Sequence, residues 1–259
     1  MAAPLIEFRN LTVYRDRTPV LRDFSLEIPA AQNVAILGPN GSGKSTLIKL
    51  MTRELYPVVA PGAELRLLGR DRWVLSELRE HLGIVTHDLM ATCTRRITGR
   101  ELVLSAFFGS VGLWPHQTVT PEMERRAASA LDLMEVGHLA PRYVNQLSSG
   151  EARRLLVARA LAHGPAALVL DEPSNSLDLR ACRELTDRLR VLAQRGTNVV
   201  LVTHHLADII PEIERVVVLK DGAVHRDGRK QDVLTREVLT EVFGVTVEVE
   251  QRDGFYAAW

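Results

Sequence analysis

The sequence has few cysteines, no excess of either charge and no long apolar run. Its 259 residues include only two cysteines, Cys93 and Cys182, which form neither a disulfide framework nor a cysteine metal cluster. Both are expected to be small buried residues in a protein of a reducing compartment. Lys plus Arg and Asp plus Glu number 32 each, so the formal net charge is zero. Because binding to a nucleic-acid backbone depends on basic residues, this balance argues against DNA or RNA as the main partner.

Two kinds of membrane-directed sequence are also missing. The amino-terminal residues lack the basic start and apolar core of a signal peptide, and no stretch approaches the ~18 continuous apolar residues of a transmembrane helix. We therefore expect a cytoplasmic protein without a membrane span of its own. The length fits one large α/β domain, or a domain with an added lobe, and 46% hydrophobic residues suffice for a sizeable core.

Strand-like and helix-like segments alternate along the chain. Three amino-terminal segments show the mixed pattern of half-buried antiparallel strands: residues 5–8, 11–14 and 24–28. Three more continuous apolar runs are typical of strands buried on both faces of a parallel sheet: residues 33–37, 166–171 and 198–203. Residues 88–160 are mainly helical in character. This order predicts parallel βαβ units with a helical lobe inserted into the α/β core.

A glycine-rich loop joins the apolar run at 33–37 to a helix expected to begin near Lys44. The loop fits the pattern G-x-x-x-x-G-K-[ST] with the following residues: Gly38, Pro39, Asn40, Gly41, Ser42, Gly43, Lys44 and Ser45, continued by Thr46. The glycines allow backbone N–H groups to surround phosphate oxygens, and the helix N-terminus adds its positive end. We predict that Lys44 reaches the β- and γ-phosphates of ATP and that Ser45 ligates Mg²⁺.

An acidic pair follows the apolar run at 166–170. Strand ends of a parallel sheet face the ligand crevice, so Asp171 is predicted to hold Mg²⁺ and Glu172 to act as general base on the attacking water. Alone, such a pair is more often a solvated strand end. Combined with the phosphate-binding loop about 130 residues earlier, it becomes a strong signal.

A serine-rich turn, Leu147-Ser148-Ser149-Gly150-Glu151, precedes a helix-like stretch that continues to Leu161. Such a turn is usually only a helix N-cap. Here the stretch resembles the signature sequence of ABC ATPases, and most of residues 5–228 resemble that family. The resemblance implies that Ser148, Ser149, Gly150 and Glu151 contact nucleotide held by a second subunit. The implied assembly is a homodimer, or a pair of cassettes, with composite ATP sites.

Three further positions match the family residue by residue. Ser176-Leu177-Asp178 resembles the loop that links the two sites, His204 resembles the switch histidine at the γ-phosphate, and Tyr14 resembles the aromatic that stacks on adenine. The alternative for Tyr14 is an ordinary strand tyrosine, and His205 is expected to be a surface residue.

One position departs from the family pattern. The family usually has a glutamine where the segment Leu82-Gly83-Ile84-Val85-Thr86-His87 ends in His87. An imidazole can hydrogen-bond to a metal-bound water, but it lacks the paired donor and acceptor of an amide. We therefore expect an atypical coupling between the nucleotide site and the partner.

These observations predict an α/β P-loop NTPase with a RecA-like core, an N-terminal antiparallel β-subdomain and an inserted helical subdomain. Residues 5–245 are expected to form one ABC ATPase domain, with the helical subdomain at 88–160 and a C-terminal tail at 246–259. Residues 103–114 resemble molybdate-type and photorepair-like cassettes, and residues 239–245 resemble iron–siderophore importer cassettes.

The resemblance implies an ATPase, with Glu172, His204 and Lys44 as catalytic residues. The leading interpretation is the ATPase subunit of an importer that powers a separate transmembrane permease and is held by it at the inner face of the cell membrane. The first alternative is a soluble ABC ATPase in repair, translation or metallocluster assembly. The second is a catalytically inactive regulatory module, against which the intact Glu172 and His204 argue.

Overall fold

The computed structural model describes residues 3–86, 89 and 96–259. These residues divide into two compact units. The first unit comprises Met1–Leu75 and Asn198–Trp259, and the second comprises Ser76–Thr197. Among the described residues, no helix is long and apolar enough to cross a membrane.

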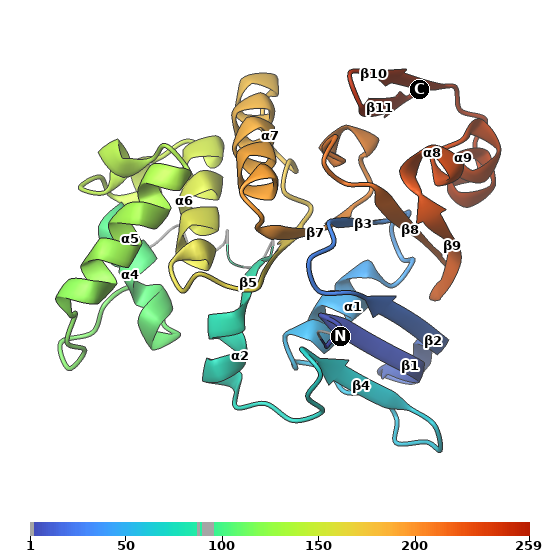
Figure 1. The fold of residues 1–259 in the computed structure, drawn as a ribbon, viewed down its shortest axis with the longest axis horizontal. Helices are drawn as coiled ribbons and strands as arrows, with labels where there is room; N and C mark the ends of the chain where they lie inside the picture. Colours follow the sequence, from blue (N-terminus) through green and yellow to red (C-terminus); the bar gives the residue numbers. More distant parts are fainter. Residues whose placement is uncertain (1–2, 87–88, 90–95) are drawn as a thin grey trace. The chain divides into compact units, whose positions relative to one another are not determined.

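The first unit begins with an antiparallel sheet in the order β2-β1-β4 (Figure 1). Its strands are β1 (Ile6–Arg15), β2 (Thr18–Ile28) and β4 (Glu64–Leu67). The two segments at 5–8 and 11–14, which the pattern predicts as separate, lie on the single strand β1 except for residue 5, which precedes it. The register against β2 shifts between Phe8 and Leu11, and Asn10 in between has a left-handed φ of 47°. This bulge explains why the alternation of apolar and polar residues breaks there.

The first unit also contains four strands in the order β7-β3-β8-β9. They are β3 (Val34–Leu37), β7 (Asn198–Thr203), β8 (Arg215–Lys220) and β9 (Ala223–Arg229). β3 runs parallel to β7 and β8, and all its residues are buried. Helix α1 (Lys44–Met51) follows β3, as the sequence predicts.

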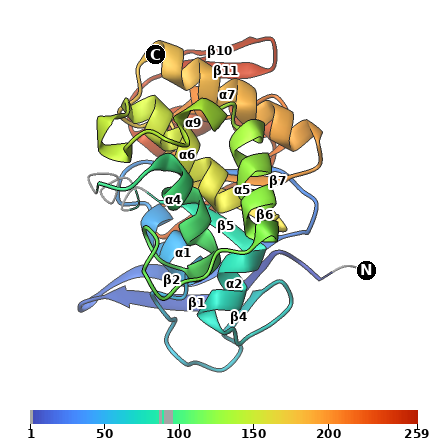
Figure 2. The same ribbon diagram turned by 90° about the vertical axis from the view of Figure 1, so that its left-hand side faces the viewer.

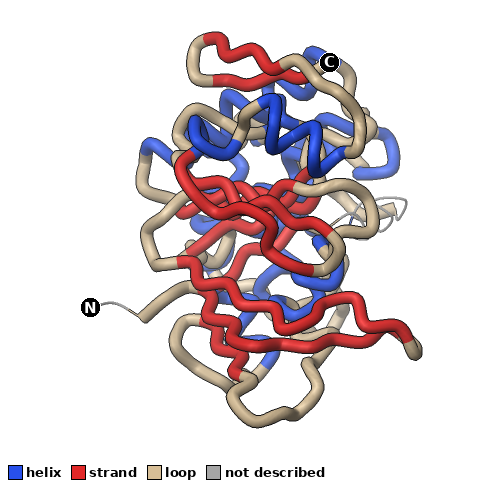
Figure 3. The backbone as a smooth tube through the Cα atoms, turned by 90° about the vertical axis from the view of Figure 1, so that its right-hand side faces the viewer, coloured by secondary structure: helices blue, strands red, loops and turns tan. Residues whose placement is uncertain are grey.

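The rest of the first unit consists of short elements, including a C-terminal hairpin (Figure 3). In chain order they are η5 (Leu206–Asp208), α8 (Lys230–Val233), α9 (Arg236–Phe243), β10 (Val249–Arg252) and β11 (Phe255–Ala258). β10 and β11 pair in antiparallel fashion. The tail predicted at 246–259 is therefore an ordered hairpin.

The second unit pairs two parallel strands, β5 (Leu82–Val85) and β6 (Ala167–Asp171), and is otherwise helical. Its helices are α2 (Leu75–His81), α4 (Gly99–Leu104), η2 (Ser105–Phe108), α5 (Pro121–Leu133), η3 (Gly137–Leu139), η4 (Val144–Gln146), α6 (Ser149–Leu161) and α7 (Leu179–Gln194). Helices α4, α5 and α6 pack together (Figure 2). Pro121 stands in the first turn of α5, and Thr120 caps it.

Candidate functional site

The phosphate-binding loop predicted from the sequence lies in the first unit, between β3 and α1. Gly43 has a φ of 105°, in the left-handed region, and a Cβ there would lie 2.7 Å from the side chain of Leu21. A Cβ on Gly38 would lie 2.6 Å from the carbonyl oxygen of Leu219. Position 43 therefore needs glycine for its left-handed conformation, and at both Gly38 and Gly43 a side chain would meet a close neighbour.

The loop presents hydrogen-bond donors of the kind that bind phosphate. Ser42 Oγ is buried and has no hydrogen-bond partner among the residues that the structure describes. The first turn of α1 carries no acidic side chain, and Gly43 at the N-cap has no side chain that could accept a backbone N–H. The first backbone N–H groups of a helix lack intrahelical acceptors, so an anion completes their hydrogen bonding. The loop thus fits the phosphates of a nucleotide.

Lys44 lies folded across this loop. It is 6% exposed, and its Nζ donates to the carbonyl oxygens of Gly38 at 2.7 Å and Pro39 at 3.0 Å. These acceptors hold the ammonium group over the loop. Ser45 is exposed in the first turn, whereas Thr46 is buried. The Ser45 hydroxyl is therefore accessible to a metal ion.

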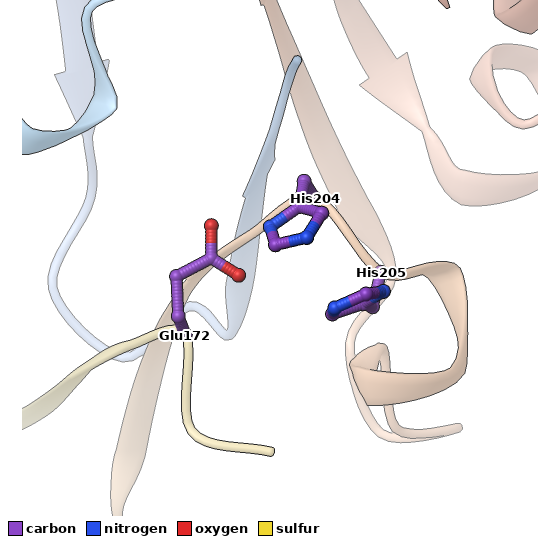
Figure 4. A group of neighbouring side chains, drawn as sticks. All are labelled: Glu172, His204 and His205. Atoms are coloured by element: carbon purple, nitrogen blue, oxygen red, sulfur yellow. The ribbon is translucent and has the colours of Figure 1, made fainter. Parts of the chain in front are cut away.

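His204 and His205 follow β7, also in the first unit (Figure 4). Their ring centroids lie 3.8 Å apart with an interplanar angle of 41°. The Thr203 hydroxyl at the strand end accepts the His205 backbone N–H at 3.0 Å and donates to Asp208 Oδ2 at 2.5 Å. His205 is exposed, as predicted, and His204 is half-buried.

Tyr14 lies near the end of β1, opposite Pro19 of β2. Its side chain is 47% exposed, so the ring face is accessible to a ligand. This exposure is compatible with stacking on adenine, because a core tyrosine would be covered. The described structure therefore leaves the stacking role of Tyr14 as a prediction.

The second unit carries the predicted acidic pair at the end of β6. Asp171 is the last residue of β6, and Glu172 follows it on the segment drawn in Figure 4. Both side chains are half-buried. Glu172 has a left-handed φ of 47°, unusual for a residue with a side chain, and its carbonyl oxygen accepts the Asn175 N–H at 3.1 Å. Such backbone strain is characteristic of functional positions.

The signature-like turn forms the start of α6. Ser148 is the N-cap: its Oγ accepts the Glu151 N–H at 3.3 Å, and Glu151 Oε2 accepts the Ser148 N–H at 2.8 Å. Glu151 also forms an ion pair with Arg142 at 3.3 Å. Burial alone would raise the pKa of Glu151, but the hydrogen bonds from Ser148 and the charges of Arg142 and Arg154 lower it overall. Glu151 therefore has a capping role that the sequence interpretation as a nucleotide contact did not include.

The signature-like turn also contacts the loop at 176–178. Ser149 Oγ donates to the Ser176 carbonyl oxygen at 3.4 Å. A Cβ on Gly150 would lie 2.5 Å from the Cβ of Ala181 in α7. Asp178 caps α7 by accepting the Ala181 N–H at 2.7 Å. The signature-like turn and the loop at 176–178 therefore pack against each other, although Ser149 and Ser176 lie 27 residues apart in the sequence.

The predicted residues therefore form two sets, and the structure describes each within its own unit. The first set comprises the loop at 38–46, Tyr14 and His204. The second set comprises residues 148–151, Asp171, Glu172 and the loop at 176–178. The prediction for His87 lies outside the described residues.

Comparison with known proteins agrees with this geometry. Residues 21–175 match the ABC transporter family, and the chain belongs to this family of ATP-binding cassettes. It is 34% identical to the hemin import ATP-binding protein HmuV of Bradyrhizobium diazoefficiens, over 96% of this chain and 92% of that protein. It is 32% identical to the sulfate/thiosulfate import ATP-binding protein CysA of Yersinia pseudotuberculosis, over 96% of this chain and 67% of that protein.

Solved structures show the same fold. A protein of Clostridium perfringens that is part of an ABC transporter complex superposes with a TM-score of 0.76 at 25% identity, covering 92% of this chain and 94% of that one. A dimeric ATP-binding cassette bound to ADP and Pi superposes with a TM-score of 0.70 at 27% identity, covering 86% and 98%. The predicted P-loop NTPase fold and the assignment as an ATP-binding ATPase are thus confirmed.

Proposed function

We propose that this chain is the ATPase subunit of an importer and drives a separate transmembrane permease. The names of the relatives support this, since both HmuV and CysA are import ATP-binding proteins. They favour the transporter interpretation over a soluble ABC ATPase in repair, translation or metallocluster assembly. In this proposal residues 5–245 act as one ABC ATPase domain with a helical subdomain at 88–160. The permease holds the chain at the inner face of the cell membrane.

The phosphate-binding loop carries the proposed chemistry of the first half-site. Its glycines and the buried Ser42 hydroxyl bind the phosphates, while Lys44 exchanges the Gly38 and Pro39 carbonyl oxygens for phosphate oxygens. Ser45 and Asp171 are the residues that would hold Mg²⁺, because hydroxyl and carboxylate oxygens are the ligands it prefers. When bound, Mg²⁺ neutralises charge on the phosphates.

Glu172 and His204 are the proposed groups for hydrolysis. Glu172 accepts a proton from the attacking water, and His204 donates a hydrogen bond to the γ-phosphate. The strained backbone of Glu172 supports this role, because its left-handed conformation fixes the direction of the side chain. Tyr14 stacks on the adenine of ATP.

The second half-site is proposed to come from another copy of the chain. The dimeric cassette bound to ADP and Pi supports this arrangement for a relative at 27% identity. Ser149 and Gly150 start helix α6, so their backbone N–H groups and the Ser149 hydroxyl are suited to bind the γ-phosphate held by the partner subunit. Ser148, whose own N–H is accepted by Glu151, places these groups as the N-cap. Glu151 holds this turn in shape through the capping box. Hydrolysis then requires both chains.

The variant Glu172→Gln tests the proposal. It should bind Mg-ATP, lose hydrolysis and accumulate as a dimer in size-exclusion chromatography with light scattering, because the general base is removed while the binding groups stay. Hydrolysis at the wild-type rate would contradict the role of Glu172. The same variant, used with Mg-ATP to capture partners from detergent-solubilised native membranes, should retain a multi-span membrane protein. Recovery of only soluble proteins or nucleic acid would favour the soluble-ATPase alternative instead.

A further inference from the structure

We propose that Lys230 and the C-terminal hairpin position the segment that carries His204, which makes Lys230 a positioning residue for ATP hydrolysis. The His204 segment is defined here as residues 204–214, between β7 and β8. The C-terminal hairpin is β10, β11 and their connecting turn. The inference rests on the catalytic role proposed above for His204.

The near end of the His204 segment is held by a buried hydrogen bond. Thr203 Oγ1 donates to Asp208 Oδ2 at 2.5 Å, and Asp208 is 8% exposed. The Asp208 N–H donates in turn to the His205 carbonyl oxygen at 3.3 Å. These bonds fix the turn at η5. Farther along the segment, Asn33 Nδ2 donates to the Glu212 carbonyl oxygen at 3.2 Å, and the Lys230 backbone N–H donates to the Glu214 carbonyl oxygen at 2.6 Å.

The Lys230 side chain supplies a further anchor beyond Asp208, called the far anchor here. Its Nζ donates to the carbonyl oxygens of Ile210 at 3.3 Å and Pro211 at 3.1 Å, both in the His204 segment. It also donates to the carbonyl oxygen of Gly254 at 3.2 Å, in the turn of the C-terminal hairpin. An ammonium group has three N–H donors, so these bonds use all of them and join the two segments through one atom.

The Lys230 side chain is half-buried and lies close to Tyr256 of the C-terminal hairpin. The ammonium group lies 5.8 Å from the ring centroid of Tyr256, which is 5% exposed, and this places it within range of a cation–π interaction. Burial lowers the pKa of Lys230, partly offset by the charges of Glu212 and Glu214. A mobile surface lysine would keep its ammonium group in water instead.

The hairpin turn also packs directly on the His204 segment. Gly254 has a φ of 81°, and a Cβ there would lie 3.0 Å from the Cβ of Pro211. Strand β11 contacts η5. Backbone hydrogen bonds between Glu248 and Trp259 close the open end of the hairpin. The hairpin is thus a rigid support on one side of the segment.

Buried apolar side chains also hold the His204 segment, since Ile209, Ile210 and Ile213 are each at most 1% exposed. A pocket of about 320 Å³ separates its first residues from the C-terminal elements. The lining includes His204, His205 and Leu206 on one side and Phe243, Val247 and Ala257 on the other. The buried isoleucines and the polar contacts at Asp208 and Lys230 together therefore hold the segment beside this pocket.

Two substitutions in the full-length chain disrupt the far anchor by different means. Lys230→Met removes the three hydrogen bonds but keeps the aliphatic stem. Gly254→Ala leaves Lys230 intact and pushes the hairpin turn away from Pro211. Lys220→Met is the matched control, since Lys220 Nζ also donates to a backbone carbonyl, that of Glu241 at 3.0 Å, which lies outside the His204 segment. His204→Ala gives the reference for loss of the histidine itself.

The measurements are kcat and KM for Mg-ATP, and the ¹³C NMR signal of the His204 ring in histidine-labelled protein, assigned with His204→Gln. Lys230→Met and Gly254→Ala should each lower kcat about tenfold and change KM by less than about twofold, because a misplaced catalytic group affects the transition state more than ground-state binding. Both should shift the His204 signal. Lys220→Met should do neither.

Wild-type kcat together with an unchanged His204 signal in Lys230→Met and Gly254→Ala would overturn the inference, even if both variants melt at lower temperature. Should Lys230→Met fail to fold, Gly254→Ala decides alone. A low kcat in His204→Ala with normal kcat in the two anchor variants rejects only the positioning role. Wild-type kcat in His204→Ala rejects the catalytic role of His204 itself. The catalytic effect proposed for the Lys230 anchor is then rejected as well, because it depends on that role.

Discussion

Replacing Gly150 with alanine puts a methyl group where helices α6 and α7 are closest. The new Cβ would lie 2.5 Å from the Cβ of Ala181. Carbon atoms in contact prefer about 3.5–4.0 Å, so the two helix starts must separate by about 1–1.5 Å. Overpacking of this kind destabilises by about 1–3 kcal/mol, which for a chain of this size lowers Tm by roughly 2–10 °C. A shift of about 1 Å in a catalytic group lowers activity by up to about 100-fold.

The cause can be isolated by a second substitution on the other helix. Ala181→Gly removes the methyl group that the new one would contact, so Gly150→Ala/Ala181→Gly should recover much of the ATPase activity and the Tm lost in Gly150→Ala. The double-mutant cycle subtracts the intrinsic effect of glycine in the first turn of α7, which is at most about 1 kcal/mol. If Gly150→Ala melts and hydrolyses ATP like the wild type, the steric argument is refuted. If activity stays low in the double variant although Tm recovers, the methyl group interferes with the nucleotide of the partner subunit instead.

Two further predictions concern residues on either side of the proposed composite site. Lys44→Ala should weaken nucleotide binding, measured by titration calorimetry, by about 10- to 100-fold, the loss expected for hydrogen bonds to a charged group; unchanged affinity would contradict the phosphate-loop assignment. Glu151→Gln should lower Tm at neutral pH but not in acid. The folded pKa of Glu151 is lowered, so its charge stabilises the protein fully above the free glutamate pKa of 4.5, and this stabilisation is lost as pH falls through the folded value. If the difference in Tm between wild type and Glu151→Gln persists unchanged at pH values below the folded pKa of Glu151, the carboxylate charge is not its source.

The parts of the site that could be predicted from the sequence are those made by local geometry. The phosphate-binding loop follows from the glycine spacing and the Lys44-Ser45 pair within eight consecutive residues, and Gly43 is left-handed in the structure. The contact that a Cβ on Gly38 would make with the Leu219 carbonyl oxygen lies outside this local pattern. The start of α6 follows likewise from the Ser148 and Glu151 capping pair, which lie three residues apart. Buried strands such as β3 and β7 are visible as apolar runs for the same reason.

The parts that could not be predicted depend on residues distant in the sequence. Lys230 contacts carbonyl oxygens 19, 20 and 24 residues away, and a backbone acceptor leaves no trace in side-chain patterns. The bulge at Asn10 was hidden for a different reason, since one left-handed residue breaks the alternation and makes one strand resemble two. The need for glycine at 150 was visible only as part of a motif, because Ala181, which imposes it, lies on another helix.

The two segments that carry the proposed hydrolytic groups are held in place in different ways. Glu172 and Ser176 both have left-handed φ angles, 47° and 65°, and each such residue costs about 1 kcal/mol or more. The neighbouring contacts offset this strain: Asp178 caps α7, and the side chain of Arg153, 1% exposed, donates to the Asn175 carbonyl oxygen at 3.5 Å. The His204 segment contains no left-handed residue, and it is held instead by buried isoleucines and by hydrogen bonds from Thr203, Asn33 and Lys230. A substitution at Asp178 should therefore release strain and disorder the loop that contains Glu172. A substitution at Lys230 removes the contacts that join the His204 segment to the C-terminal hairpin, and should shift that segment without releasing backbone strain.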